Sequence, residues 1–304
     1  MKVTLISTVR DAGPFIGDFL DSIREQTRPP DEVVIVDGGS TDETLGVLRA
    51  APDITLIEVP GANIPAGRVA AIRAATHDVI AVSDADCVLT PRWLELLATA
   101  IESGADVAMG SYRPIVGGFF EACSAATQVP EIDELDEATF MPSSRSVAFT
   151  REAYERAGGY PEWLDVGEDM YLNHRLRDQD AVMTLVPDAV TMWRVRPTLE
   201  ATWNQYFNYA KGDAIAGMWP KRHALRFGVY AALPLLLRSR WGQLLVLAGG
   251  IAYAWRPLRR AFRLLSDPKE RAAAVAAVPT LMAFSDIAKM AGYISGLRAR
   301  GSRD

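Results

Sequence analysis

The sequence predicts an α/β protein in which a mixed, mainly parallel sheet flanked by helices is followed by a helical, membrane-associating region. Two observations support this fold class. In the first 110 residues, short apolar runs rich in β-branched residues alternate with segments of helical apolar spacing, which is typical of a doubly wound sheet. From Thr198 onward, long apolar stretches bounded by arginine replace the strand-like runs. The order of the strands does not follow from the sequence.

The predicted strands are apolar runs of the kind found in buried parallel sheets. The first five lie at residues 3–9, 32–37, 54–59, 78–86 and 105–112. An acidic loop is expected at 130–138, followed by a strand at 145–150 and two short strands within 181–193, separated at Pro187.

The predicted helices follow from start signals in the sequence. Ser40 and Glu43 have the spacing of a capping box, and Asn63 with Pro65 has the pattern of a cap followed by proline in the first turn. We expect helices at residues 14–23, 41–50, 64–75, 91–102, from 151, 167–178 and 198–219.

Composition and charge narrow the classes of protein to which the chain can belong. The chain has 304 residues, of which 49% are hydrophobic and 23% charged, which excludes a disordered chain, a collagen and a disulfide-rich miniprotein. Residues 1–193 carry 14 Lys and Arg against 32 Asp and Glu (−18), whereas residues 194–304 carry 18 against 6 (+12). We therefore expect the two parts to face different partners.

The cysteines and the first residues of the chain indicate the cellular compartment in which the protein is expected. Cys87 and Cys123 are the only cysteines and have no paired spacing, which argues against a disulfide framework or a cysteine-rich zinc site and fits a reducing compartment. The apolar run before Arg10 is too short for a signal-peptide core. We expect no signal peptide.

Three uncharged apolar stretches lie in the C-terminal part, at residues 227–237, 241–255 and 272–285. They are shorter than the roughly 20 residues that a membrane-spanning helix needs. Arginines flank them, which is how a protein adheres to an anionic leaflet. The sequence therefore favours membrane association, with a soluble helical subdomain of basic surface as the alternative.

Two carboxylates end a predicted buried strand. Asp84 and Asp86 follow the run VIAVS, and alternation along an extended chain places residues i and i+2 on the same side. Paired carboxylates are costly to bury without a cation, and oxygen ligands select Mg²⁺ or Mn²⁺. Ligands of open α/β sheets bind at the carboxyl ends of the strands. Solvated turn residues are the alternative.

Asp37 ends another predicted strand at the same edge of the sheet. It is followed by Gly38, Gly39 and Ser40, and glycines permit a ligand to approach the backbone closely. An ordinary strand-turn-helix cap explains the same residues. No G-x-G-x-x-G or G-x-x-x-x-G-K-[ST] motif is present, so the common dinucleotide and P-loop interpretations lack support.

Four segments in this order resemble a known family. They are STVRD (7–11), VVIVDGGSTDET (33–44), GANIPAGRVAAIRAATHDVIAVSDADC (61–87) and GEDMYLNHRLRD (167–178). The set, which spans about residues 2–195, is similar to the family-2 inverting glycosyltransferases of the GT-A fold. The resemblance implies a catalytic domain at 1–197, with a nucleotide-sugar half at 1–110 and an acceptor half at 111–197, and a membrane-attachment region at 198–304.

The resemblance also implies roles for individual residues. On the donor side, these residues are Thr8 and Arg10 in the loop that cradles the base and ribose, Asp37 at the base, Arg68 beside the donor, and Asp84 with Asp86 as the D-x-D motif for ribose and metal. On the acceptor side, Asp169 of the Glu168–Asp169 pair corresponds to the general base, and Arg145 to an acceptor contact.

Two departures from the family pattern qualify these roles. Many relatives carry His where this sequence has Trp193, so Arg194 or Arg196 is expected to supply a cation there, with a core role for Trp193 as the alternative. Processive members carry Q-x-x-R-W, whereas Gln205 is followed here by Asn208 and Tyr209. We therefore expect non-processive transfer.

The expected activity is hexosyl transfer from a nucleotide sugar, UDP-linked by resemblance, to a lipid-linked or glycan acceptor with inversion. It depends on Mn²⁺ or Mg²⁺ and takes place at the cytoplasmic face of the membrane, with no nucleic-acid partner. Two alternatives remain. The run DADCV (84–88) also matches the D-x-D-x-[TV] signature of aspartyl-phosphate phosphatases, and a non-catalytic, membrane-attached nucleotide-sugar-binding protein retains the same fold.

Overall fold

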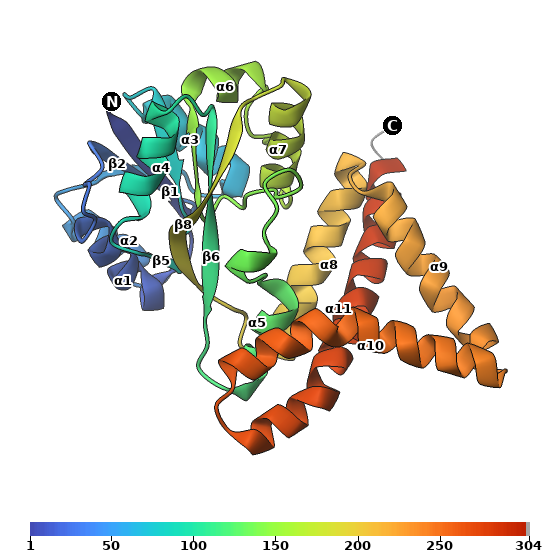
Figure 1. Cartoon of the computed structure of the whole chain (residues 1–304). Coiled ribbons are helices and arrows are strands. Elements are labelled where there is room, and N and C mark those ends of the chain that lie inside the picture. The colour runs from blue at the N-terminus through green and yellow to red at the C-terminus, as the bar shows by residue number, and fades with distance from the viewer. Residues whose placement is uncertain (302–304) are drawn as a thin grey trace. The chain divides into compact units, whose positions relative to one another are not determined.

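The computed structural model describes residues 1–301 as two compact units (Figure 1). The sheet unit comprises residues 1–115 and 132–194, and the helical unit comprises residues 116–131 and the chain from 195 onward. Residues 116–131, which we expected in the acceptor half of the first domain, pack instead with the C-terminal helices.

The sheet unit contains one mixed sheet of eight strands in the order β3-β2-β1-β4-β7-β6-β8-β5. The strands are β1 (Val3–Val9), β2 (Glu32–Asp37), β3 (Thr55–Glu58), β4 (Val79–Val82), β5 (Cys87–Leu89), β6 (Val107–Ile115), β7 (Val147–Thr150) and β8 (Met183–Arg194). The first four pair in parallel, as do β6 and β8, whereas β7 runs antiparallel to β4 and β6, and β5 to β8. The mixed, mainly parallel sheet expected from the sequence is confirmed.

Helices cover both faces of this sheet and bury its apolar side chains. They are α1 (Gly13–Arg24), α2 (Thr44–Ala50), α3 (Ile64–Ala74), α4 (Trp93–Glu102), α6 (Arg151–Arg156), α7 (Glu168–Asp178) and the short 3₁₀ helix η1 (Ile132–Glu134). One core joins the sheet to α1 and α4 through Phe19 and Trp93. The other joins it to α3 and α7 through Ile72 and Leu176.

The expected strand at 78–86 is shorter in the structure. β4 ends at Val82, and the amide of Ser83 donates the last hydrogen bond to the carbonyl of Ile6 in β1. A turn follows, in which the amide of Cys87 donates to the carbonyl of Asp84 at 3.1 Å. The prediction that Asp84 and Asp86 share one side of an extended strand was therefore wrong, because the chain turns to pair with β8.

Two further local predictions were wrong and one is confirmed. Ser40 does not cap α2, because its hydroxyl bonds to Asp37 and the amide of Asp11 instead. Residues 183–194 form one strand, β8, in which Pro187 lies at a bulge opposite β6; a bulge accommodates a residue without an amide hydrogen. Asn63 caps α3 as expected, accepting from the amide of Ala66 at 2.9 Å.

The helical unit consists of α5 (Phe119–Gln128), α8 (Leu199–Ala216), α9 (Pro220–Leu236), α10 (Arg240–Leu264) and α11 (Pro268–Gly301). α8 is the long aromatic helix that the sequence predicts. A small core of alanines and aliphatic residues joins α5, α10 and α11, with Cys123, Ala261 and Val278 fully buried.

One helix in the described part of the chain, α11, is long and apolar enough to cross a membrane. Its most apolar segment is 39% buried, and α11 packs closely on α8: a Cβ atom at Gly292 would lie 2.0 Å from the carbonyl oxygen of Phe207. Length and composition alone are thus weak evidence that α11 spans a bilayer.

Candidate active site

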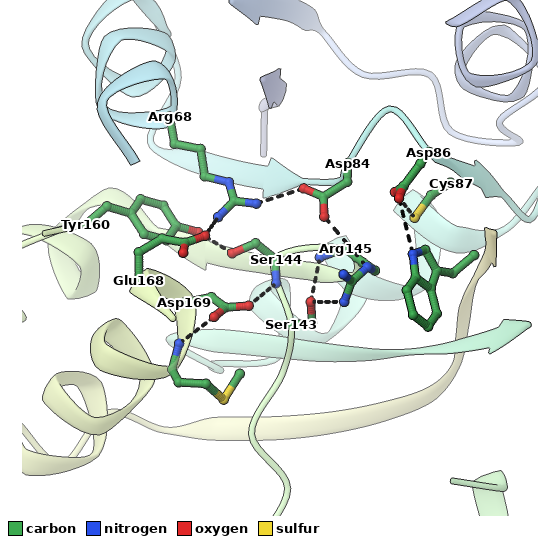
Figure 2. Close-up of polar contacts among 12 residues, drawn as sticks. Arg68, Asp84, Asp86, Cys87, Ser143, Ser144, Arg145, Tyr160, Glu168 and Asp169 are labelled. Carbon is green, nitrogen blue, oxygen red and sulfur yellow. Dashed lines mark hydrogen bonds and ion pairs between the residues drawn. The ribbon is translucent and has the colours of Figure 1, made fainter. Parts of the chain in front are cut away.

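Four of the acidic residues singled out in the sequence lie in one network of polar contacts in the sheet unit (Figure 2). Asp84 and Asp86 lie in the turn after β4, and Glu168 and Asp169 form the first turn of α7. Arg145 lies in the segment that leads into β7, the strand next to β4. Residues far apart in the chain thereby form one polar cluster.

Arg68 of α3 links the two acidic groups. Its guanidinium donates to Asp84 Oδ1 at 2.7 Å and to Glu168 Oε1, and it lies 5.3 Å from the centre of the Tyr160 ring. Only 3% of Arg68 is exposed. Burial disfavours its charged form, but the adjacent carboxylates of Asp84 and Glu168 outweigh this effect and raise the pKa of Arg68. The Arg68 guanidinium is therefore held between these two carboxylates.

Glu168 and Asp169 are neighbours with different environments. Glu168 is buried, and this desolvation raises its pKa to about 7 even though Arg68 opposes the shift. Asp169 is half-buried; its Oδ1 accepts from the amide of Met170 at 2.8 Å and its Oδ2 lies 3.4 Å from the amide of Ser144. Both lie at the amino end of α7, where the helix dipole favours negative charge.

Tyr160 and Ser144 complete the buried side of the cluster, and sequence reasoning missed both. The Tyr160 hydroxyl and Ser144 Oγ are 2.8 Å apart, and burial raises the pKa of Tyr160. This bond fixes the segment that carries Arg145 beside α7. The sequence offers one signal for Tyr160, the preceding pair Gly158–Gly159, which is typical of a turn. The structure shows this turn, with a positive φ at both glycines.

Trp193 of β8 connects the other carboxylate to Arg145. Its indole Nε1 donates to Asp86 Oδ2 at 3.3 Å, and the Arg145 guanidinium lies 4.4 Å from its ring centre. Arg145 Nη1 also donates to Ser143 Oγ at 3.0 Å, and Nε lies 3.7 Å from Asp84 Oδ2. A buried tryptophan thus holds one carboxylate and supports one cation at the same edge.

Arg194, expected to supply a cation here, points elsewhere. Its side chain pairs with Asp18 of α1 and lies 5.1 Å from the ring centre of Phe15. Arg196 belongs to the helical unit. Asp84 of the D-x-D turn contacts the cations Arg68 of α3 at 2.7 Å and Arg145 of the segment before β7 at 3.7 Å.

The expected donor residues on β1 and β2 lie at the ends of neighbouring strands. Asp37 is buried and accepts from the amides of Gly39 and Ser40, both at 2.9 Å. Thr8 pairs with Val36 across the two strands, and Arg10 is exposed with Asp11 3.8 Å away. Asp37 thus shapes a turn whose second residue, Gly39, has a φ of 98°, which favours glycine.

No group of three or more His, Cys, Asp or Glu side chains among residues 1–301 is arranged to hold a metal ion. Asp84 and Asp86 offer two carboxylates. Mg²⁺ commonly binds through one or two carboxylates together with waters and substrate phosphates. The donor set therefore fits a divalent cation that binds together with a phosphate ligand.

About half of the chain matches the model of a known family. Residues 4–154 match the family model described as Glycosyl transferase family 2. The chain belongs to glycosyltransferase family 2. The matched region contains the D-x-D turn, so the family accounts for DADCV and the phosphatase alternative has no independent support.

A curated relative is also a glycosyltransferase, and two solved structures show that the chain has the GT-A fold. The O-antigen chain rhamnosyltransferase RfbN of Salmonella typhimurium is 23% identical over 68% of this chain and 71% of its own length. The mannosyltransferase PcManGT from Pyrobaculum calidifontis, solved with GDP-Man and Mn²⁺, superposes with a TM-score of 0.58 at 23% identity, covering 98% of this chain and 88% of its own. S. aureus TarS 1–349, in complex with UDP, superposes with a TM-score of 0.53 at 16% identity, covering 100% and 92%.

Proposed function

We propose that this glycosyltransferase moves a sugar from a nucleotide-sugar donor to an acceptor hydroxyl with inversion at the anomeric carbon. The observation that carries the proposal is the Arg68 bridge, which joins Asp84 of the D-x-D turn to the Glu168–Asp169 pair. It brings the group expected at the donor and the group expected at the acceptor to one edge of the sheet. A single displacement needs both groups within reach of the same carbon.

Asp169 is the proposed general base. Its neighbour Glu168 is buried and engaged by Arg68, whereas Asp169 is half-exposed at the start of α7. As the acceptor oxygen attacks the anomeric carbon, Asp169 takes the hydroxyl proton and the bond from that carbon to the diphosphate oxygen breaks. The nucleoside diphosphate leaves with the bonding electrons.

Asp84 and Asp86 are the proposed ligands of a divalent cation, Mn²⁺ or Mg²⁺. When bound, the cation offsets the negative charge that the leaving diphosphate gains. Arg145 adds a fixed positive charge beside Asp84, held in place by Trp193. The solved relatives with GDP-Man and Mn²⁺ and with UDP support this choice of donor class and cation.

The donor-binding surface is proposed to run along the ends of β1, β2 and β4. Thr8, Arg10 and Asp37 flank the base and ribose, and Asp84 reaches the ribose. A UDP-linked hexose and non-processive transfer follow from the resemblance set out above. The name of the Salmonella relative supports an acceptor in polysaccharide or glycolipid synthesis, either a glycan or a lipid-linked sugar.

The helical unit is proposed to attach the enzyme to the cytoplasmic face of the membrane. Its support is the net charge of +12 over residues 194–304, combined with apolar stretches that arginines bound. On this proposal the domain organisation has two parts, a transferase part to about residue 197 and an attachment part beyond it.

A donor panel tests the activity. Purified full-length protein is incubated with UDP-, GDP-, dTDP- and CMP-linked sugars, with Mn²⁺, Mg²⁺ or chelator, and with or without membrane lipid extract, while release of the nucleotide is measured. We expect release from one donor class, dependent on the cation and stimulated by the extract. No release from any donor under any condition would contradict the proposal and favour the non-catalytic alternative.

A further inference from the structure

We propose that one face of α10 lies in the plane of an anionic lipid leaflet, and that this face attaches the protein to the membrane. The proposal rests on the membrane attachment proposed above and names the surface responsible for it. The lipid-facing stripe, as we call it, consists of six of the exposed apolar residues of α10, Trp241, Leu244, Leu245, Leu247, Ile251 and Trp255. Tyr253, which is 60% exposed, lies outside it.

The stripe is a single face of the helix. At 100° per residue these positions fall within about 160° of the helix circumference. Each of the six is at least 56% exposed, and Trp241 is 82% exposed. Six large apolar side chains on one face exceed what a water-exposed helix ordinarily presents, which marks an interaction surface.

The opposite face of α10 is fixed by contacts inside the helical unit. Ala254, Pro257 and Ala261 are buried there. The hydroxyl of Tyr253 donates to Asp286 Oδ2 of α11 at 3.0 Å, and Arg260 donates to the carbonyl of Ala126 in α5 at 3.1 Å. These contacts set the rotation of α10 about its axis, so the lipid-facing stripe points away from the core of the unit.

The turn before α10 is also tightly defined. Ser239 Oγ accepts from the amide of Gly242 at 3.0 Å, which caps the helix. A Cβ atom at Gly242 would lie 1.9 Å from the carbonyl oxygen of Leu236, so the end of α9 packs directly on the start of α10. Figure 1 shows α9 and α10 meeting at a corner that projects from the other helices of the unit. The stripe begins at this corner.

Charge and length identify a lipid leaflet as the partner. Arg240 precedes Trp241 and Arg256 follows Trp255, and both arginines are exposed. Tryptophan beside arginine at each end is typical of the headgroup level of a membrane. The uncharged stretch 241–255 between the arginines extends about 22 Å as a helix, less than the roughly 30 Å hydrocarbon core, so the helix lies along the leaflet.

α11 is the competing attachment element because it meets the length and composition of a spanning helix. Its polar residues argue otherwise. Asp286 is 4% exposed and accepts from Arg226 Nε at 2.8 Å, while Lys289 lies 4.2 Å from the ring centre of Tyr206 in α8. α11 therefore serves as the internal packing helix of its unit, and α10 exposes more large apolar side chains than either α9 or α11.

Vesicle flotation tests the proposal with the full-length protein. The vesicles contain phosphatidylcholine alone or with phosphatidylglycerol. The stripe variant carries Leu244→Ser, Leu247→Ser and Ile251→Ser. The matched control carries Val275→Ser, Ile287→Ser and Leu297→Ser, which replace apolar residues of α11 with comparable exposure.

We expect wild-type protein to float with the anionic vesicles, the stripe variant to bind at least about tenfold more weakly, and the control to stay within about twofold of wild type. Replacing Arg240 and Arg256 by Gln should weaken binding about fivefold per arginine, a difference that high salt should abolish. Because the readout is lipid binding, Asp169→Asn should float like wild type, so this test and the sugar-transfer test fail independently.

Three results would overturn the proposal: equal binding to both vesicle compositions or to neither, loss of binding in the α11 control with the stripe variant unaffected, or a stable dimer that the stripe variant dissociates and vesicles do not. Circular dichroism and nucleotide release in detergent are measured for all variants. A variant that has lost its fold shows a changed spectrum and no release. If the stripe variant has lost its fold, the single change Leu244→Ser, at a site 56% exposed, replaces its three changes.

Discussion

The two units of this glycosyltransferase differ in which side chains they expose to solvent. Among the described residues, five large apolar side chains are exposed in the sheet unit and eighteen in the helical unit, although the sheet unit contains more residues. The sheet unit buries its apolar groups and displays acidic ones, whereas the helical unit displays apolar groups between arginines. The difference is the one expected if, as proposed above, the sheet unit binds a small charged ligand and the helical unit binds lipid.

Both units bury ion pairs, but with different outcomes. In the helical unit, the buried Asp286 is surrounded by Arg226, Tyr230 and Tyr253. In the sheet unit, Arg68 holds Asp84 and Glu168 at the edge of a site where Asp169 stays half-exposed. The first cluster ties helices together, and the second leaves a carboxylate available for chemistry.

The largest expected effect comes from Asp169→Asn, which removes the proposed base from the sheet unit. Because general-base catalysis contributes about 10²- to 10⁴-fold, we expect kcat to fall by that range while the donor Kd changes little. Steady-state transfer assays give kcat, and calorimetry gives the Kd of the donor. Asp178→Asn, at the exposed far end of the same helix, is the matched control, and equal loss in both would remove the assignment.

Arg68→Ala tests the buried ion cluster. The change leaves Asp84 and Glu168 without their shared counter-charge, and breaking a buried pair costs about 3–5 kcal/mol in comparable sites. The free energy of unfolding should fall by up to that amount when it is measured above pH 7, where Glu168 is mostly ionised in the wild type. The control is Arg24→Ala, which breaks an exposed pair with Asp53 and should cost less than about 1 kcal/mol. Urea denaturation compares them; similar losses would mean that Arg68 is not a structural clamp.

Trp193→Phe tests the support of the D-x-D turn. It deletes the N–H that donates to Asp86, and loss of such a partner to a metal ligand typically costs about 10- to 100-fold in metal affinity or activity. We expect the Mn²⁺ concentration for half-maximal activity to rise within that range. The exposed Trp163, changed to Phe, is the control. A Trp193→Phe enzyme with unchanged Mn²⁺ dependence would contradict this role.

The smallest effect is a pH dependence of stability. Burial raises the pKa of Glu168 to about 7 from its ordinary value of 4.5, so between these values the folded state binds more protons than the unfolded state. Stability should therefore fall as the pH rises from about 5 to 7, by at least the roughly 1.4 kcal/mol that one pKa unit represents. In Glu168→Gln this slope should flatten; an unchanged slope would assign it to another group.

Much of the sheet unit follows from local patterns in the sequence, but its pairing does not. The strands β1 to β4 and the cap at Asn63 were predicted because β-branched runs and capping residues act locally. The insertion of β7 between β4 and β6 depends on long-range antiparallel pairing, which periodicity does not encode. The packing of residues 116–131 with the C-terminal helices likewise depends on contacts between segments far apart in the chain.

The candidate site, too, could be predicted from the sequence only in part. Asp84, Asp86, Glu168 and Asp169 were found through their place in motifs, and the structure brings Arg68 and Arg145 to them. The burial of Arg68 and the bond from Trp193 to Asp86 come from side chains on separate elements, and no spacing in the sequence indicates them. Arg194 was expected at the site because of its neighbour Trp193, yet it points to α1.

Chemistry in the sheet unit and membrane contact in the helical unit should be separable. The most direct test measures nucleotide release in detergent and flotation with anionic vesicles on two proteins, Asp169→Asn and the stripe variant. We expect Asp169→Asn to lose release and keep flotation, and the stripe variant to keep release and lose flotation. If either protein lost both properties while remaining folded, or if the two losses were exchanged, this division of roles would be contradicted.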